Sequence, residues 1–328
     1  MGLFDKRTTY KPFEYAHITN PLIDAMWSGH WTVNEFTFTS DVQDYKTALT
    51  KEEKEVINRA ILLISSIEVT VKSYWSSIGR LIPKPEISDM GAVFGGVEVI
   101  HSRAYSEILA KLGLNDKFQA ALAEGFVQRR VNYLNKYNDK VYKDDKKQIA
   151  YSLALFSIFT EYVTLFSQFY ILLGFNRFNN VLKDVSNVVN YTSKEETLHA
   201  EGGFQILKQM KKEYPEVFDE EFKQRISDEA KEAVLAEEGL VSWMLQGFSN
   251  DFLSEEILNE YIKVRMNDAL KRLGIPKIHP TNKALSSKLT WMDEEIYAPN
   301  MADFFNKKPI EYTRKNRSYT IKDLYKNG

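Results

Sequence analysis

Two pairs of glutamate and histidine at helical spacing are the residues most able to do chemistry in this chain. Glu98 stands three residues before His101, and Glu196 stands three residues before His199. Positions i and i+3 lie on the same face of an α-helix, so each pair can reach one metal ion from one helix. We therefore take the four side chains as candidate metal ligands.

A lone glutamate in an apolar segment precedes each pair. Glu68 lies in ILLISSIEVTVKSYW, 30 residues before Glu98, and Glu161 lies in IAYSLALFSIFTEYVTLFSQFYILLGF, 35 residues before Glu196. A buried carboxylate with no partner is unfavourable, but four of them neutralise two divalent cations. This repeated arrangement is typical of dimetal carboxylate helix bundles. Carboxylate and imidazole ligands suit manganese or iron.

An ordinary structural role is the alternative for these residues. Glu68 and Glu161 could pair with buried lysine or arginine, and the histidines could be core residues. A third pair, Glu14 and His17, lies in a segment that contains Pro12 and Pro21, where helical spacing need not hold. We interpret this third pair as chance.

The hydrophobic pattern predicts an all-α protein, which with the ligand pattern indicates a ferritin-like helical bundle. Residues 1–22 are expected to form an extended arm of the bundle domain, residues 1–305, and the basic, polar residues 306–328 a flexible tail. Gly113, Gly174 and Gly274 are expected near helix C-termini. Helices are expected at 51–79, 88–112, 115–138, 145–173, 178–212, 219–248, 254–273 and 281–296.

Composition excludes several classes of protein. The 328 residues include 43 basic and 45 acidic side chains, a net charge of −2 that favours neither nucleic acid nor an anionic membrane. No cysteine is present, which excludes thiolate chemistry and sulfur-ligated metals. Residues 149–175 are long and apolar enough to span a membrane, but a buried bundle helix gives the same pattern and is the reading we favour. The N-terminus lacks an apolar signal region, so we expect a cytoplasmic protein.

At the candidate ligands the sequence resembles the small (beta) subunit of class I ribonucleotide reductase. VEVIHSRAYSEIL and SKEETLHAEGG resemble that family's two ligand helices, and GHWTVNEF and MADFFNKKPIEYTR resemble its tryptophan segment and its tail. The resemblance covers nearly the whole chain. It implies a homodimer whose dimetal site stores an oxidising equivalent and passes it to a cysteine on a separate large (alpha) subunit, so that ribonucleotides are reduced.

The resemblance also implies roles for individual residues. Trp31 and Tyr312 would belong to the radical-transfer path, with Tyr312 as the relay in the tail. Glu195 stands where many members have an aspartate that links the tryptophan to a histidine ligand. Tyr105 would be the site of a stable radical, or else an unoxidised neighbour of a metal-centred oxidant, which is the reading we favour.

Glu68 together with Lys72 resembles the dimanganese subgroup, class Id, in which superoxide activates the metals. Lys72 lies one helical turn after Glu68 and should share its face, although a lysine extended to the surface is the alternative. Two manganese ions are therefore preferred, with di-iron or mixed manganese and iron as alternatives. A hydroxylase or desaturase on the same bundle and a ferritin-like storage protein are rival functions.

Overall fold

The computed structural model describes residues 2–125, 127–128, 130 and 145–297, with only the backbone of residues 68–70. The predicted tail and Tyr312 lie outside the described residues. Within the described part the secondary structure is helical and contains no β-strand. The longer helices are α1 (Ala16–Ser28), α3 (Lys51–Ser65), α4 (Glu68–Leu81), α5 (Pro85–Lys111), α9 (Phe166–Asn179), α10 (Lys183–Glu213), α11 (Glu220–Leu245) and α12 (Glu255–Arg272). Shorter elements are α2 (Thr39–Thr47), α6 (Asn115–Leu122), α8 (Lys146–Ser152), α13 (Lys283–Ser286) and α14 (Thr290–Tyr297), with η1 (Val33–Glu35), η2 (Leu153–Thr164), η3 (Pro215–Phe218) and η4 (Ser287–Leu289).

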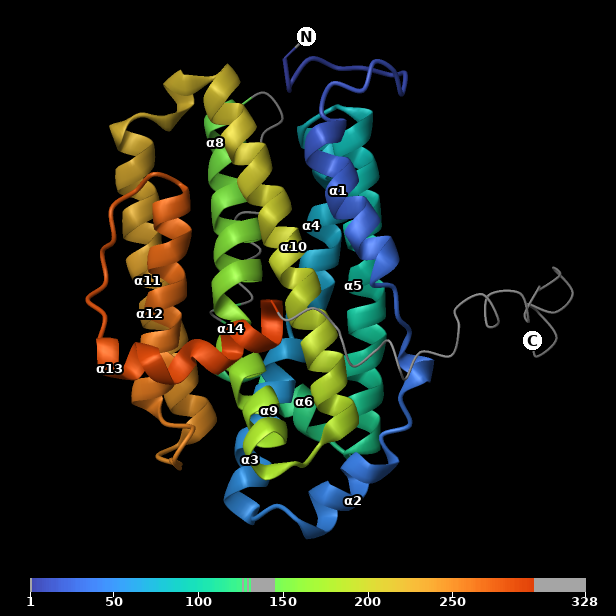
Figure 1. Cartoon of the computed structure of the whole chain (residues 1–328), viewed down its shortest axis with the longest axis vertical. Coiled ribbons are helices and arrows are strands. Elements are labelled where there is room, and N and C mark those ends of the chain that lie inside the picture. Colours follow the sequence, from blue (N-terminus) through green and yellow to red (C-terminus); the bar gives the residue numbers. More distant parts are fainter. Residues whose placement is uncertain (1, 126, 129, 131–144, 298–328) are drawn as a thin grey trace, which may run out of the picture.

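The long helices run side by side along the long axis of the molecule (Figure 1). The column formed by α8, η2 and α9 lies in the middle, with α11 and α12 on one side and α10, α1, α4 and α5 on the other. The short helices α13 and α14 run across the long helices, between the two ends of the bundle. This arrangement confirms the predicted ferritin-like helical bundle.

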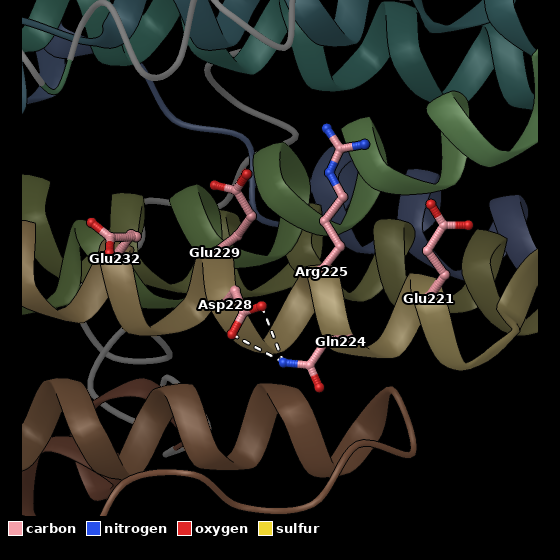
Figure 2. A pocket seen from close by; sticks show the side chains of 6 residues that line it. All are labelled: Glu221, Gln224, Arg225, Asp228, Glu229 and Glu232. Atoms are coloured by element: carbon pink, nitrogen blue, oxygen red, sulfur yellow. Dashed lines mark hydrogen bonds between the residues drawn. The ribbon is translucent and has the colours of Figure 1, made fainter.

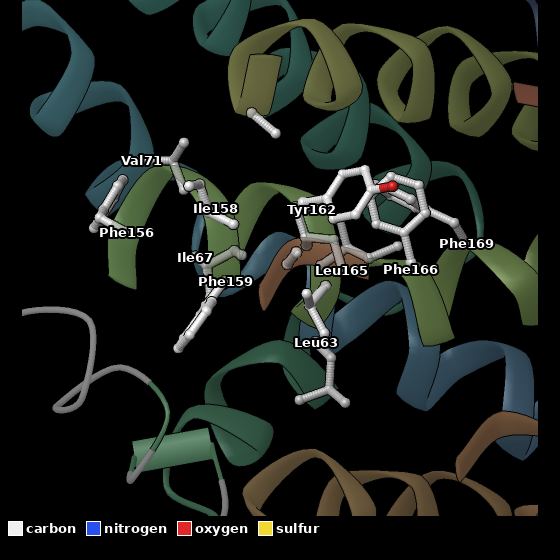
Figure 3. Close-up of a cluster of buried hydrophobic side chains, with 14 of the residues drawn as sticks. Leu63, Ile67, Val71, Phe156, Ile158, Phe159, Tyr162, Leu165, Phe166 and Phe169 are labelled. Atoms are coloured by element: carbon white, nitrogen blue, oxygen red, sulfur yellow. The ribbon is translucent and has the colours of Figure 1, made fainter. Parts of the chain in front are cut away.

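The central column is buried on all sides, which explains its apolar sequence. The segment Lys146–Asn179 is long and apolar enough to cross a membrane, but every residue of its most apolar window is buried by the other helices. Figure 3 shows part of this core, where Leu63, Ile67 and Val71 meet Phe156 and Phe159. The burial of these side chains supports the interpretation of a core helix rather than a membrane span.

The expected extended arm is partly wrong, because α1 begins at Ala16. Ile18, Leu22, Ile23 and Met26 repeat at helical spacing and are buried against the bundle. This apolar face stabilises the helix although Pro21 lies inside it. In the region of the third pair, His17 is exposed and Glu14 forms ion pairs with Arg7 and Lys84.

Two of the expected helices are interrupted. The helix expected at 51–79 divides into α3 and α4, because Ser65 and Ser66 donate their hydroxyls to the carbonyls of Ile61 and Leu63 and compete with the helical hydrogen bonds. The helix expected at 281–296 divides into α13, η4 and α14.

The helix expected at 145–173 contains a π-helix, η2, between α8 and α9. The hydroxyls of Thr160 and Thr164 bond to carbonyls of the preceding turn, at 3.4 Å to Leu155 and 3.2 Å to Thr160. A π-helix is wider than an α-helix and commonly marks a functional site. Its wider turn changes the direction in which each side chain of this segment points.

Two of the three expected terminal glycines are confirmed. Gly113 and Gly274 follow α5 and α12 with φ of 70° and 77°, the left-handed conformation that ends a helix. Gly174 lies inside α9 instead, and the helix continues to Asn179. At Gly174 the absent side chain leaves room for Phe252, whose ring would lie 3.0 Å from an added Cβ.

Candidate metal centre

Five of the six predicted ligands converge in the middle of the bundle. Glu98 and His101 come from α5, Glu161 from η2, and Glu196 and His199 from α10. All five side chains are at most 1% exposed. One potential ligand atom from each of Glu98, Glu161, Glu196 and His199 lies within 4.8 Å of the others. The structure thus gathers these side chains at one buried point.

The inner nitrogen of each histidine faces the carboxylates. Nδ1 of His101 lies 3.1 Å from Glu98 Oε2 and 3.3 Å from Glu196 Oε1. Nδ1 of His199 lies 2.9 Å from Glu98 Oε1, 3.0 Å from Glu196 Oε2 and 3.5 Å from Glu161 Oε2. The two Glu-x-x-His pairs therefore face one another across the centre, as their i, i+3 spacing predicted.

Close contact between α10 and η2 brings Glu196 and His199 within reach of Glu161. A Cβ on Gly203 would lie 2.0 Å from the hydroxyl oxygen of Ser157 on η2. Only glycine permits this approach of the two helices. The glycine that follows the second ligand pair thus has a packing role in the geometry of the centre.

The electrostatics of the cluster require a cation. Within the described part of the chain, no lysine or arginine forms an ion pair with Glu98, Glu161 or Glu196. Burial and the nearby Glu196 raise the pKa of Glu161 well above its usual value. Burial alone would lower the pKa of each histidine, but the charge of Glu98 and the carboxylate hydrogen bonds raise the pKa of His101 and His199 well above the usual value. In the metal-free protein, protons bound to these side chains must balance the negative charge of the carboxylates.

The donor set fits a pair of divalent metal ions. Glu98 Oε1 and Glu161 Oε2 are buried, and neither accepts a well-formed hydrogen bond among the described residues. Such orphaned carboxylate oxygens beside imidazole nitrogens are the ligands that manganese and iron prefer. The interpretation in which Glu161 pairs with a buried lysine or arginine has no support from its contacts.

Trp31 is connected to the centre through Glu195. The indole nitrogen of Trp31 donates to the two carboxylate oxygens of Glu195 at 3.1 and 3.0 Å. Glu195 Oε2 lies 2.7 Å from Nε2 of His101, the nitrogen that points away from the cluster. The rings of Trp31 and His101 are nearly parallel, with centroids 6.3 Å apart. The structure therefore joins these predicted residues in one hydrogen-bonded chain.

The remaining predicted residues of the described part come from α4 and α5. Tyr105 is 1% exposed and stands one helical turn after His101 on α5. Glu68 is the first residue of α4, and its side chain lies outside the description. Lys72 is half-buried on the same helix, and no contact joins it to the described ligands.

Trp75 is a residue that sequence reasoning missed. Its indole nitrogen donates to Glu161 Oε1 at 2.7 Å, and it is fully buried. A signal for it was available, because Trp75 follows Glu68 by seven residues and so lies on the same face of the helix.

A surface hollow along α11 is not part of the centre. Figure 2 shows its lining, all from this one helix, with Gln224 donating to Asp228 at 3.1 and 3.0 Å. Lys231 also donates to Asp228, at 2.8 Å. Glu221 pairs with Lys147 of α8 and Arg225 stacks on Tyr151, so these side chains have ordinary structural partners.

Comparison with known proteins identifies the family. Residues 7–286 match the model of the ribonucleotide reductase small chain. The chain belongs to this family. It is 26% identical over 327 residues to the probable ribonucleoside-diphosphate reductase small subunit 048L of Invertebrate iridescent virus 3, covering 95% of this chain and 86% of the viral protein. It is 22% identical over 306 residues to the ribonucleoside-diphosphate reductase subunit beta of Halalkalibacterium halodurans, covering 92% and 87%.

Solved structures show the same fold. The ribonucleotide reductase R2 subunit from Clostridium botulinum superposes with a TM-score of 0.76 at 19% identity, covering 86% of this chain and 89% of that chain. Streptococcus sanguinis dimanganese(II)-NrdF gives a TM-score of 0.73 at 16% identity, covering 87% and 99%.

Family membership gives the chain its activity. It is the radical-generating small subunit of a ribonucleoside-diphosphate reductase, an oxidoreductase with a dimetal site and a large-subunit partner. The family match favours this function over the hydroxylase, desaturase and storage alternatives.

Proposed function

We propose that six side chains hold two metal ions at the centre: Glu68, Glu98, His101, Glu161, Glu196 and His199. The observation that carries the proposal is the convergence of three buried carboxylates and two histidines, with no lysine or arginine among the described residues paired to these carboxylates. Glu68 would complete the set from the first turn of α4, the helix packed along α5. Its carboxylate brings the charge of the ligands to minus four, which balances two divalent ions.

The metals would supply the one-electron oxidant of the small subunit, and the chain's residues have three tasks around them. The bundle core excludes water from the ligands, since Trp75, Phe94 and Phe159 are fully buried. The carboxylates and the inner histidine nitrogens fix the positions of the ions. Trp31, Glu195 and His101 form the route by which charge leaves the centre, because indole N–H, carboxylate and imidazole are in direct hydrogen-bond contact.

We further propose that the ions are manganese and that the oxidant belongs to the metals rather than to Tyr105. Two features support this proposal: the Glu68 and Lys72 pair at i, i+4 in the sequence, and a fold neighbour whose name describes a dimanganese(II) protein. Lys72 would add a positive charge to a centre that is otherwise neutral, which would attract an anionic oxidant such as superoxide. Iron, alone or mixed with manganese, would use the same ligands.

Metal analysis with electron paramagnetic resonance tests the ligand set and the metal together. We expect two manganese ions per chain and a multiline manganese spectrum after activation. Tyr105→Phe removes only a hydroxyl and should preserve that spectrum and most of the turnover. Loss of activity in Tyr105→Phe, together with loss of a sharp organic radical signal, would place the oxidant on Tyr105 instead.

Lys72→Met tests the role of the lysine. The substitution keeps most of the side chain's volume and removes its charge. We expect slower activation by superoxide with metal stoichiometry unchanged. Equal activation rates in wild type and variant would remove Lys72 from the mechanism.

We propose that residues 306–328 bind the large subunit, with Tyr312 as the relay residue, and that the small subunit is a cytoplasmic homodimer. Exposed Trp27 on α1 and Val99 on the adjacent α5, at 60% and 43%, are apolar side chains available to a second copy. Deletion of residues 313–328 should abolish complex formation and nucleotide reduction while the melting temperature and metal content stay unchanged. A large drop in melting temperature would show that the tail belongs to the fold.

A further inference from the structure

Trp75 makes a direct contact with one of the proposed ligands. Its indole N–H donates to Glu161 Oε1 at 2.7 Å, and both side chains are completely buried. The other carboxylate oxygen, Oε2, lies 3.5 Å from Nδ1 of His199 and faces the cluster. The indole therefore occupies one oxygen of Glu161 and leaves the other directed at the metal site.

The indole is held rigidly in this position. Its ring meets Phe94 edge-on, with centroids 4.9 Å apart at 87°, and lies 5.9 Å from the ring of His199. The neighbouring Tyr74 also packs edge-on against it, at 5.5 Å and 80°. Aromatic contacts of this kind fix the ring plane, and hence the direction of the N–H bond.

The backbone of Trp75 is equally constrained. A Cβ on Gly91 of α5 would lie 2.5 Å from the carbonyl oxygen of Trp75, so the two helices approach here more closely than any other residue would allow. The position of the indole is therefore set by packing between α4 and α5. It does not depend on Glu161, which comes from η2 on another part of the chain.

Glu161 needs such a support because of where it lies. It belongs to a π-helix, whose side-chain directions are less regular than those of an α-helix. A hydrogen-bond donor fixed in the adjacent helix restricts the carboxylate to one rotamer before the metal arrives.

We infer that Trp75 is a positioning residue for Glu161, which presents a single carboxylate oxygen to the metal because the indole holds the other. This inference rests on the proposed role of Glu161 as a ligand. Removing a residue that hydrogen-bonds to a metal ligand typically lowers metal affinity by about 10- to 100-fold. Trp75 would act on the centre through a carboxylate ligand, whereas Glu195 acts through His101.

The test compares Trp75→Phe with Trp291→Phe. The first variant keeps an aromatic ring and removes the N–H that Glu161 accepts. The second removes a buried indole N–H that donates to the hydroxyl of Tyr170 at 3.2 Å and makes no contact with the ligands. Manganese binding to the metal-free proteins is measured by calorimetry, and the loaded proteins are compared by electron paramagnetic resonance.

We expect Trp75→Phe to bind one of its two manganese ions about 10-fold more weakly and to show an altered dimanganese spectrum. Trp291→Phe should match the wild type in both measurements, whatever its melting temperature. Wild-type affinity and spectrum in a folded Trp75→Phe would overturn the inference. If the wild type itself fails to bind two ions, the proposed ligand set fails instead, so the two failures are distinguishable.

An isosteric replacement keeps the test decisive if Trp75→Phe does not fold. β-(3-Benzothienyl)alanine at position 75 retains the shape of tryptophan and replaces only the N–H by sulfur. The same weakened binding and altered spectrum are expected from it. Unchanged binding with this residue would also overturn the inference.

Discussion

Two of the regions in which the protein buries carboxylates neutralise them in different ways. At the metal centre, Glu98, Glu161 and Glu196 face each other and two histidines. Elsewhere in the bundle, Glu237 of α11 lies 3.5 Å from Nε of Arg130, both nearly inaccessible. Arg130 also donates to the carbonyl of Thr164 at 2.7 Å. The guanidinium of Arg130 neutralises Glu237. The three carboxylates of the centre have no such partner among the described residues, so a bound metal ion would have to neutralise them.

This difference separates a structural site from a functional one. A carboxylate paired with arginine contributes to the fold as long as both partners remain. A group of carboxylates with no lysine or arginine partner gains stability when metal binds. Removing a carboxylate should therefore weaken metal binding in the first region and leave it unchanged in the second.

Glu196→Gln should produce the largest change in function. It removes one ligand and one negative charge, so we expect loss of at least one bound metal ion and no measurable nucleotide reduction. The melting temperature of the metal-free protein should fall, because hydrogen bonds with Glu161, His101 and His199 hold the pKa of Glu196 well below its usual value, so that its charged form stabilises the fold. Metal analysis, an activity assay with the large subunit and thermal denaturation check the three outcomes. Two ions bound at wild-type affinity would contradict the ligand assignment.

Arg130→Met should destabilise the fold without affecting the metal centre. Glu237 would lose its basic partner, and the carbonyl of Thr164 would lose a donor. We expect a loss of about 3 kcal/mol in the free energy of unfolding at pH 8, and less at pH 6, where Glu237 can take up a proton. Denaturant unfolding at the two pH values measures this difference. A manganese affinity equal to that of the wild type is the accompanying control.

Glu195→Gln tests the connection between the metal centre and Trp31. The amide keeps the side chain's length but has one acceptor oxygen in place of the two that now serve Trp31 and His101. We expect manganese affinity to fall about 10-fold, and turnover at saturating metal to fall further because the route is interrupted. Glu201→Gln is the matched control on α10, since that carboxylate pairs with Arg272 near the surface. Equal turnover in both variants would exclude Glu195 from the route.

Glu237→Gln should give the smallest effect, a change in how stability depends on pH. Burial raises the pKa of Glu237 to about 7 against an ordinary value of 4.5, despite the nearby Arg130. A raised pKa stabilises the fold below pH 4.5, and this contribution is lost as the pH rises to 7. Relative to wild type, the variant should gain about 1 kcal/mol per pH unit across that window. A constant difference between the two proteins would show that Glu237 does not titrate there.

The helical class and the choice of candidate ligands followed from local patterns. Glu-x-x-His on an amphipathic segment needs only the helical repeat to bring both side chains to one face, so Glu98 and His101 could be predicted without any contact partner. The lone Glu161 in an apolar segment could be predicted for the same reason, because a charge among buried residues requires a counter-charge. Gly113 and Gly274 ended helices as expected, since their conformation is set by the local chain.

Two features of the fold escaped these patterns. The prolines suggested an extended arm where α1 forms, because its apolar face is stabilised by contact with α5 and α10. The hydroxyls of Ser65 and Ser66 divided a helix whose periodicity is otherwise continuous. In both cases interactions outside the repeating pattern decided the outcome.

The sequence by itself determined which residues could bind metal and which helices carry them, because those facts depend on residue type and spacing along one helix. Only the tertiary structure decided how the ligands are supported. Trp75 reaches Glu161 because Gly91 permits close packing of α4 and α5. Trp31 and His101 share Glu195 because a loop, α5 and α10 meet there. Hydrogen bonds between distant segments depend on the relative positions of whole helices, and those positions are set by packing throughout the core.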